Sequence, residues 1–136
     1  MPIETKPFLA EAQASPKMIL LVEDDPSICS FLVEAITQET PYRVMVASDG
    51  NAALKLVQHV APRLFVLDYG LPGMNGIELY DRLHLMQAFA PIPAVLITAN
   101  RNLPPHQIHQ RQLIIFQKPF DLEAFLRTID TLLTSS

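Results

Sequence analysis

The sequence predicts one α/β domain in which helices cover both faces of a five-stranded parallel sheet. Two observations lead to this fold class. Short apolar runs alternate with segments of helical periodicity five times along the 136 residues, and alternation of this kind builds a doubly wound parallel sheet. Each run is apolar throughout, as expected for strands that are buried on both faces. The length suits one domain, and the 49% hydrophobic content is sufficient for a core.

Each expected strand is a short run of apolar residues, and the five runs span 18–22, 43–47, 64–67, 94–97 and 113–116. The first helix is expected to begin at Pro26, with Asp25 as its N-cap. The second follows the turn at Ser48–Gly50 and runs to about His59, and the third spans 76–86. Residues 99–112 are irregular, so a helix that begins at Pro104 or Pro105 would be short. The last helix begins at an Asp121 cap.

Polar residues follow four of these strands at their carboxyl ends. The loops after parallel strands lie along one edge of the sheet, which is where open α/β sheets bind ligands. Asp68 follows a buried strand and precedes a loop that holds three of the four glycines. The sequence therefore predicts that one edge carries Glu23, Asp24, Asp68, Thr98 and Lys118.

Composition limits the function classes. The net charge of −4 without a basic run argues against direct binding of nucleic acid. A single cysteine, Cys29, excludes an internal disulfide framework and is compatible with a reducing cytosol. No apolar run is as long as a membrane span, and the N-terminus lacks a signal-peptide pattern. We therefore expect a cytoplasmic domain at residues 17–136, preceded by a flexible tail or linker at residues 1–16.

The charges at the predicted edge indicate a metal site. Three carboxylates and one ammonium leave −2, and two carboxylates about 4 Å apart repel by roughly 4 kcal/mol at an effective dielectric of 20. A divalent cation would remove this repulsion, and a set of oxygen ligands suits Mg²⁺. With the metal bound, Asp68 could act as a nucleophile toward phosphorus. Thr98 and Lys118 would then meet the phosphoryl oxygens.

Four motifs carry a resemblance to a known family. ILLVEDDP, FVLDYGLPGMNG, VLITAN and QKPF resemble, in order and in spacing as far as Thr98, the motifs of bacterial two-component response regulator receiver domains. The resemblance covers about residues 17–134. It implies a flavodoxin-like sheet with strand order 2-1-3-4-5 and a cis peptide bond at Lys118–Pro119.

The resemblance also implies roles for the residues at the edge. Asp68 would be the phospho-acceptor, while Glu23 and Asp24 would hold Mg²⁺ together with Asp68 and the backbone carbonyl of Gly70. Thr98 would be the switch hydroxyl that turns toward the phosphoryl group. Lys118 would be the ion-pair partner of that group.

By this resemblance, Asp68 takes a phosphoryl group from a phosphohistidine on a sensor histidine kinase or a histidine phosphotransfer protein. The domain catalyses its own modification and is not a turnover enzyme. The phosphorylated form would signal to a protein partner through the fourth helix, fifth strand and fifth helix. The sequence leaves open whether the domain is a stand-alone regulator or part of a longer protein, and whether it forms a homodimer.

Three departures from the family pattern stand out. Ile115 occupies the position three before the lysine, where the family has a switching Tyr or Phe, and the adjacent Phe116 should face the opposite side of the strand. The segment between Thr98 and Lys118 is shorter than usual and contains two adjacent prolines. Gly70 places no side chain over the acceptor.

Two alternatives remain open at this stage. A receiver-fold module that binds partners without phosphorylation is favoured by Ile115 and by the irregular segment at 99–112. A phosphatase with an aspartyl-phosphate intermediate commonly needs a second carboxylate two residues after the nucleophile, and this position is Gly70. The four histidines are expected at the surface, and His106 and His109 could form a weak metal pair only if their segment is helical.

Overall fold

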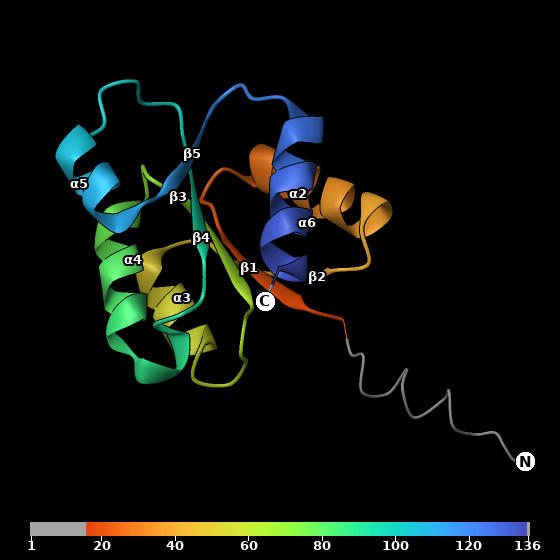
Figure 1. Ribbon diagram of the computed structural model, residues 1–136, viewed down its shortest axis with the longest axis horizontal. Helices are drawn as coiled ribbons and strands as arrows, with labels where there is room; N and C mark the ends of the chain where they lie inside the picture. The colour runs from red at the N-terminus through yellow and green to blue at the C-terminus, as the bar shows by residue number, and fades with distance from the viewer. Residues whose placement is uncertain (1–15, 136) are drawn as a thin grey trace, which may run out of the picture.

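The computed structural model describes residues 16–135 and confirms the predicted fold class. Five parallel strands form one sheet in the order β2-β1-β3-β4-β5 (Figure 1). The strands are β1 (Met18–Val22), β2 (Arg43–Ala47), β3 (Leu64–Asp68), β4 (Ala94–Thr98) and β5 (Ile114–Gln117). The central strand β3 is buried along its whole length, as its unbroken apolar run predicts.

Helices cover both faces of the sheet. Helices α2 (Pro26–Glu39) and α6 (Leu122–Thr134) lie on one face, and α3 (Gly50–Leu56), α4 (Gly76–Leu85) and α5 (Pro105–Arg111) lie on the other (Figure 1). Alternate residues of each strand point to opposite faces. In β1, Ile19 and Leu21 enter the core beneath α2 and α6, whereas Leu20 and Val22 enter the core beneath α3 and α4.

Side-chain caps fix where several helices begin. Asp25 and Asp121 cap α2 and α6 as predicted, each accepting a hydrogen bond from a backbone N–H two residues later. Asn75 caps α4 in a reciprocal arrangement, because Glu78 accepts a hydrogen bond from the Asn75 N–H while Asn75 accepts one from the Glu78 N–H. The Lys118–Pro119 peptide bond is cis, as the resemblance implies.

Two helical segments differ from the prediction. Helix α3 ends at Leu56 rather than near His59, because the last residues form a turn in which the His59 N–H donates to the Leu56 carbonyl. A short 3₁₀ helix, η1 (Gln87–Phe89), follows α4 in a segment for which the sequence predicted no element. It places Phe89 edge-on against Phe65 in the core.

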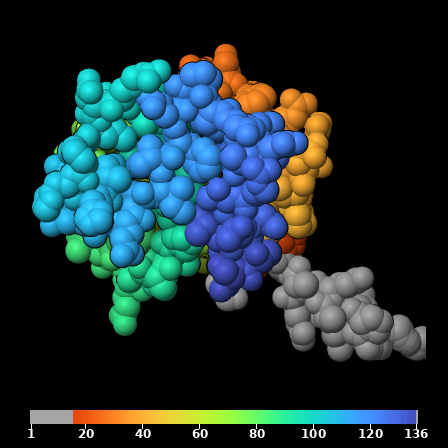
Figure 2. Space-filling model, turned by 45° about the horizontal axis from the view of Figure 1, so that its top comes forward, coloured from red at the N-terminus to blue at the C-terminus, as the bar shows by residue number. Residues whose placement is uncertain are grey.

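Helix α5 is as short as its two prolines suggest. It begins after Pro104 without a side-chain cap and ends at Gln112 in the left-handed conformation, and none of its residues is fully buried. The Arg111 guanidinium holds it against α4, donating to both carboxylate oxygens of Asp81 at 2.7 and 2.8 Å. Figure 2 shows the α5 segment at the surface, with the β5 segment between it and α6.

Within residues 16–135, the structure holds no helix that is both long and apolar enough to cross a bilayer. Of the tail predicted at residues 1–16, residues 1–15 lie outside the described residues.

Candidate functional site

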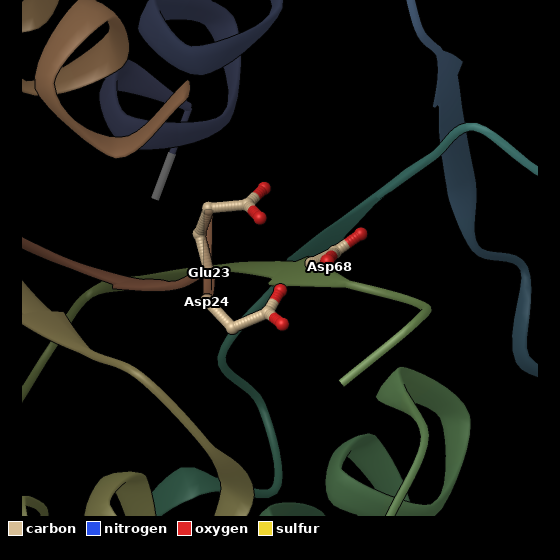
Figure 3. A group of neighbouring side chains, drawn as sticks. All are labelled: Glu23, Asp24 and Asp68. Carbon is tan, nitrogen blue, oxygen red and sulfur yellow. The ribbon is translucent and has the colours of Figure 1, made fainter. Parts of the chain in front are cut away.

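Three carboxylates gather where β1 and β3 end. Glu23 and Asp24 directly follow β1, and Asp68 is the last residue of β3, the neighbouring strand. One carboxylate oxygen from each lies within 4.8 Å of the others, and Figure 3 shows the side chains directed toward the same space. Glu23 and Asp68 are only 2% and 5% exposed, whereas Asp24 is exposed to solvent.

Backbone contacts hold these carboxylates in place. The Glu23 N–H donates to the carbonyl of Ala47 on β2 at 3.0 Å, which extends the sheet one residue past β1. The Tyr69 N–H donates to the carbonyl of Ile97 at 2.8 Å and similarly fixes the chain directly after Asp68. Glu23 also accepts a hydrogen bond from the Asp25 N–H at 3.0 Å. The acidic groups are therefore positioned by the sheet itself.

Lys118 connects two of the carboxylates. Its Nζ donates to Glu23 Oε1 at 3.0 Å and to Asp68 Oδ1 at 3.2 Å. Burial acts to lower the pKa of Lys118, but the hydrogen bond from its ammonium to Glu23 and the charge of Asp68 outweigh burial, so the pKa is raised. The lysine is thus held as a cation between two acidic groups that reach it from different strands.

For Glu23, burial has the largest effect on the pKa. Burial raises the pKa of the Glu23 carboxyl, although hydrogen bonds from Asp25 and Lys118 act to lower it. The nearby charge of Asp68 adds to the increase. Folding therefore makes ionisation of Glu23 less favourable than in the unfolded chain, and a bound cation would offset this cost.

Thr98 lies beside this group at the end of β4 and is 2% exposed. Its hydroxyl oxygen accepts a hydrogen bond from the Asn100 N–H at 2.8 Å and donates to the Asn100 carbonyl at 3.4 Å. Its carbonyl accepts a hydrogen bond from the Lys118 N–H at 2.7 Å. The Thr98 hydroxyl is thus bonded to its own loop and, within the described part of the chain, to none of the three carboxylates.

Asn100 was not singled out in the sequence. Its position two residues after Thr98 could have indicated it, because a threonine hydroxyl often closes a short turn by bonding the backbone two residues later. Gly70 lies exposed in the loop two residues after Asp68, and a Cβ added there would meet nothing within 4 Å. A side chain at this position would therefore extend into open space.

The two residues before the Gln117–Lys118 pair lie as predicted. Ile115 packs against the core beneath α4 and α5, and Phe116 packs on the opposite face against Phe120 and Phe125. The ring of Phe116 therefore cannot take the place of the missing aromatic residue at Ile115, because alternate strand residues face opposite sides.

The surface assignment of the histidines was wrong for His84. This side chain is half-buried, stacks on Tyr80, and places its two ring nitrogens 2.8 Å from the Tyr80 carbonyl and 2.7 Å from the Ile92 carbonyl. The Ile92 contact depends on the unpredicted turn of η1. His59, His106 and His109 are exposed as expected.

The acidic group suits a divalent metal ion. Within residues 16–135, the only group of three side chains able to hold an ion is Glu23, Asp24 and Asp68. All of its ligand atoms are carboxylate oxygens, which hard divalent cations such as Mg²⁺ prefer. The three negative charges exceed the one positive charge of Lys118, so the group is compatible with a divalent ion.

Comparison with known proteins finds relatives of this chain in sequence and in fold. Residues 19–130 match the family described as the response regulator receiver domain. The chain is 38% identical over 81 residues to the DNA-binding response regulator MtrA of Mycolicibacterium smegmatis, a match covering 60% of this chain and 34% of that protein. It is 29% identical over 119 residues to hybrid signal transduction histidine kinase D of Dictyostelium discoideum, covering 86% of this chain and 8% of that protein.

Among solved structures, the chemotaxis protein CheY4 of Vibrio cholerae superposes with a TM-score of 0.78. The match covers 88% of this chain and 100% of that chain at 23% identity, which shows that the two share a fold. The chain spans about a third of the first relative named above and less than a tenth of the second.

Proposed function

This chain belongs to the response regulator receiver domain family, and we propose that Asp68 accepts a phosphoryl group from a phosphohistidine in a Mg²⁺-dependent reaction. The observation that carries the proposal is that Lys118 lies within hydrogen-bonding distance of Glu23 and Asp68 in a group of three carboxylates. The phosphoryl donor would be a sensor histidine kinase or a histidine phosphotransfer protein. Relatives that include histidine kinases support this class of donor.

The chain's own residues account for the transfer. An Asp68 carboxylate oxygen attacks phosphorus, a new O–P bond forms, and the N–P bond of the phosphohistidine breaks as its imidazole leaves and takes up a proton. Glu23, Asp24, Asp68 and the Gly70 carbonyl would hold Mg²⁺. When bound, Mg²⁺ supplies positive charge against the phosphoryl oxygens. Lys118 would exchange its bond to Asp68 for one to a phosphoryl oxygen, which keeps its ammonium paired.

Thr98 would respond to the phosphorylation of Asp68. For its hydroxyl to turn toward the new phosphoryl group, it must leave the Asn100 N–H, and the loop that follows β4 then loses a hydrogen bond. Residues 100–112 would move in response and alter a surface formed by α5, β5 and α6, where a downstream protein partner would bind.

Receiver domains are signalling domains, and in this chain we propose a self-catalysed modification rather than turnover of a substrate. We propose residues 17–136 as the receiver domain and residues 1–16 as a tail or linker. A cytoplasmic location is proposed because the phosphohistidine donors expected here act there.

Intact mass spectrometry tests the proposal directly. The protein is incubated with acetyl phosphate and Mg²⁺, alongside Asp68→Asn and a sample with excess EDTA. One added phosphoryl group in the first sample and none in the other two would support both the acceptor and the metal requirement. An adduct that persists in Asp68→Asn would contradict the assignment of the acceptor.

The second candidate is a receiver-fold module that binds partners without phosphorylation. Ile115 and the exposed helix α5 favour it. Mg²⁺ titration separates the two, since a module of this kind has no requirement for a metal. No Mg²⁺ binding together with no mass adduct would favour the module.

A further inference from the structure

A hollow lies next to Thr98 on the face of the sheet away from α2 and α6. It has a volume of about 450 Å³, within the range of roughly 300–1,000 Å³ typical of sites for small molecules. Loop 99–104, α5 and β5 enclose it, and the segments that surround it lie at the surface in Figure 2. Thr98, Leu103, Ile108, Leu113, Ile115 and Gln117 are among the residues that line it.

Large apolar side chains line the hollow beside its polar residues. Leu113 and Ile115 point into it from the β5 segment, and Leu103 and Ile108 close it from the loop and from α5. The face of α5 that borders it has no fully buried residue, so an apolar ligand would remove further apolar surface from water. The body of the ligand is therefore expected to be aromatic or branched aliphatic.

Gln117 gives the hollow a polar group without a partner. Its Nε2 is buried, and no acceptor within residues 16–135 lies in hydrogen-bonding range of it. A buried donor left unpaired costs folding free energy, so its presence calls for an explanation. The side chain lines the hollow, and rotation about its last torsion, which has broad minima, can turn the amide toward a ligand. An acceptor on the ligand would pair it.

The charges that line the hollow indicate what kind of hydrogen-bond acceptor the ligand carries. Arg101 lines the hollow, and no Asp or Glu does. Arg101 has no ion-pair partner among the described residues, since the ion pairs there involve Arg111 and Lys118. One free guanidinium, one unpaired amide and no negative group favour an anionic head over a neutral or cationic one.

We propose that this hollow binds a small organic carboxylate with an aromatic or branched apolar body. The body packs against Leu113 and Ile115, and the carboxylate accepts hydrogen bonds from Gln117 and Arg101. The position of Thr98 extends the proposal, because this residue contributes both to the hollow and to the edge that holds Asp68. This extension rests on the proposed function: the ligand would change how readily Thr98 turns toward a phosphoryl group, and phosphorylation would change ligand affinity by the same factor.

Methyl and amide NMR titration with phenylacetate tests the binding. We expect saturable shifts at Ile108, Ile115 and the Gln117 side-chain amide at millimolar concentrations. Acetate has the carboxylate without the apolar body, so it should produce no saturable shift. 2-Phenylethanol has the apolar body without the charge, so it should bind more weakly than phenylacetate. Equal responses to acetate and phenylacetate would overturn the proposal.

Variants locate the site. Ile115→Phe fills the hollow and should abolish binding, whereas Gln117→Met keeps the length of the side chain without its donor and should weaken binding about tenfold. Gln110→Met on the exposed side of α5 is the matched control and should bind like the wild type. If Ile115→Phe fails to fold, the affinity of Gln117→Met for phenylacetate tests the proposal alone. Unchanged affinity in Gln117→Met, or in folded Ile115→Phe, would overturn the proposal.

A second experiment tests the coupling between ligand binding and phosphorylation separately from binding itself. Phenylacetate is added to protein treated with acetyl phosphate, and the rate of phosphoryl loss is followed by intact mass. A change of at least twofold supports the coupling, and an unchanged rate with bound phenylacetate overturns it. NMR shifts together with no phosphoryl adduct and no Mg²⁺ binding would refute the proposed function and leave the ligand site standing. Shifts from an acidic peptide that contains phenylalanine, with none from phenylacetate, would assign the hollow to a protein partner and overturn the proposal.

Discussion

Gly76 lies so close to Asp68 that a Cβ on Gly76 would come within 2.6 Å of the Asp68 carbonyl oxygen. The same Cβ would also lie 2.7 Å from a methyl carbon of Leu96. The Gly76 N–H donates to the Tyr69 carbonyl at 2.9 Å, so the loop after β3 closes back on the strand it leaves. The start of α4 is therefore packed directly against the backbone of the residue proposed as phospho-acceptor.

From this packing we predict that Gly76→Ala lowers the free energy of unfolding by about 1–3 kcal/mol, because backbone and side chain must both shift to admit the methyl group. Gly70→Ala is the matched control, since a Cβ there meets nothing within 4 Å. Urea unfolding of both variants measures the difference. Equal losses in the two variants would show that the close approach to Asp68 does not matter for stability.

Mg²⁺ should stabilise the folded domain. A ligand that binds only the folded state adds about 2.7 kcal/mol at a concentration of 100 times its Kd. We expect the melting temperature to rise with Mg²⁺ and to return on addition of EDTA. Asp68→Asn should diminish the rise, whereas Glu34→Gln, on an exposed part of α2, should retain it. A rise of the same size in Asp68→Asn would place the ion elsewhere.

The ion pair of Arg111 with Asp81 should hold α5 in position. Because both groups are partly exposed, its loss should cost no more than about 1 kcal/mol in global stability. The larger effect of Arg111→Ala is expected in faster amide hydrogen exchange across Pro105–Arg111, since this helix has no fully buried residue. Arg82→Ala, an exposed change on α4, is the control. Exchange in α5 that matches the wild type would argue that its apolar contacts suffice.

The parts of the structure that follow from short stretches of sequence could be predicted. The strands follow from unbroken apolar runs, the caps at Asp25 and Asp121 from residues beside the helix start, and the assembly of the acidic group from the rule that parallel strands end at one edge. Ile115 and Phe116 separate to opposite faces because side chains alternate along a strand.

What could not be predicted depends on contacts between segments. The setting of His84 requires the carbonyl of Ile92, which the turn of η1 brings back toward α4. The bridge from Lys118 to two carboxylates requires the distances between three strands, which residue types alone do not provide. The closeness of Gly76 to Asp68 likewise appears only once α4 is packed on the sheet.

The raised pKa of Glu23 predicts how stability changes with pH when no metal is present. Its ordinary value is 4.5, and burial raises it in the folded protein. Below 4.5 the group is protonated in both states and has no effect on the free energy of unfolding. As the pH rises through 4.5 toward the higher folded value, the unfolded chain loses its proton first, and the folded state becomes less stable through this group.

Glu23→Gln mimics the protonated side chain at every pH. In EDTA, the variant should therefore match the wild type near pH 4 and become the more stable of the two as the pH rises toward neutrality. In Mg²⁺ the order should reverse, because the wild type alone retains the buried carboxylate that the proposed metal requires. Urea unfolding across this range in both buffers measures the difference. A stability difference that does not vary with pH would show that the charge of Glu23 carries no cost in the folded domain.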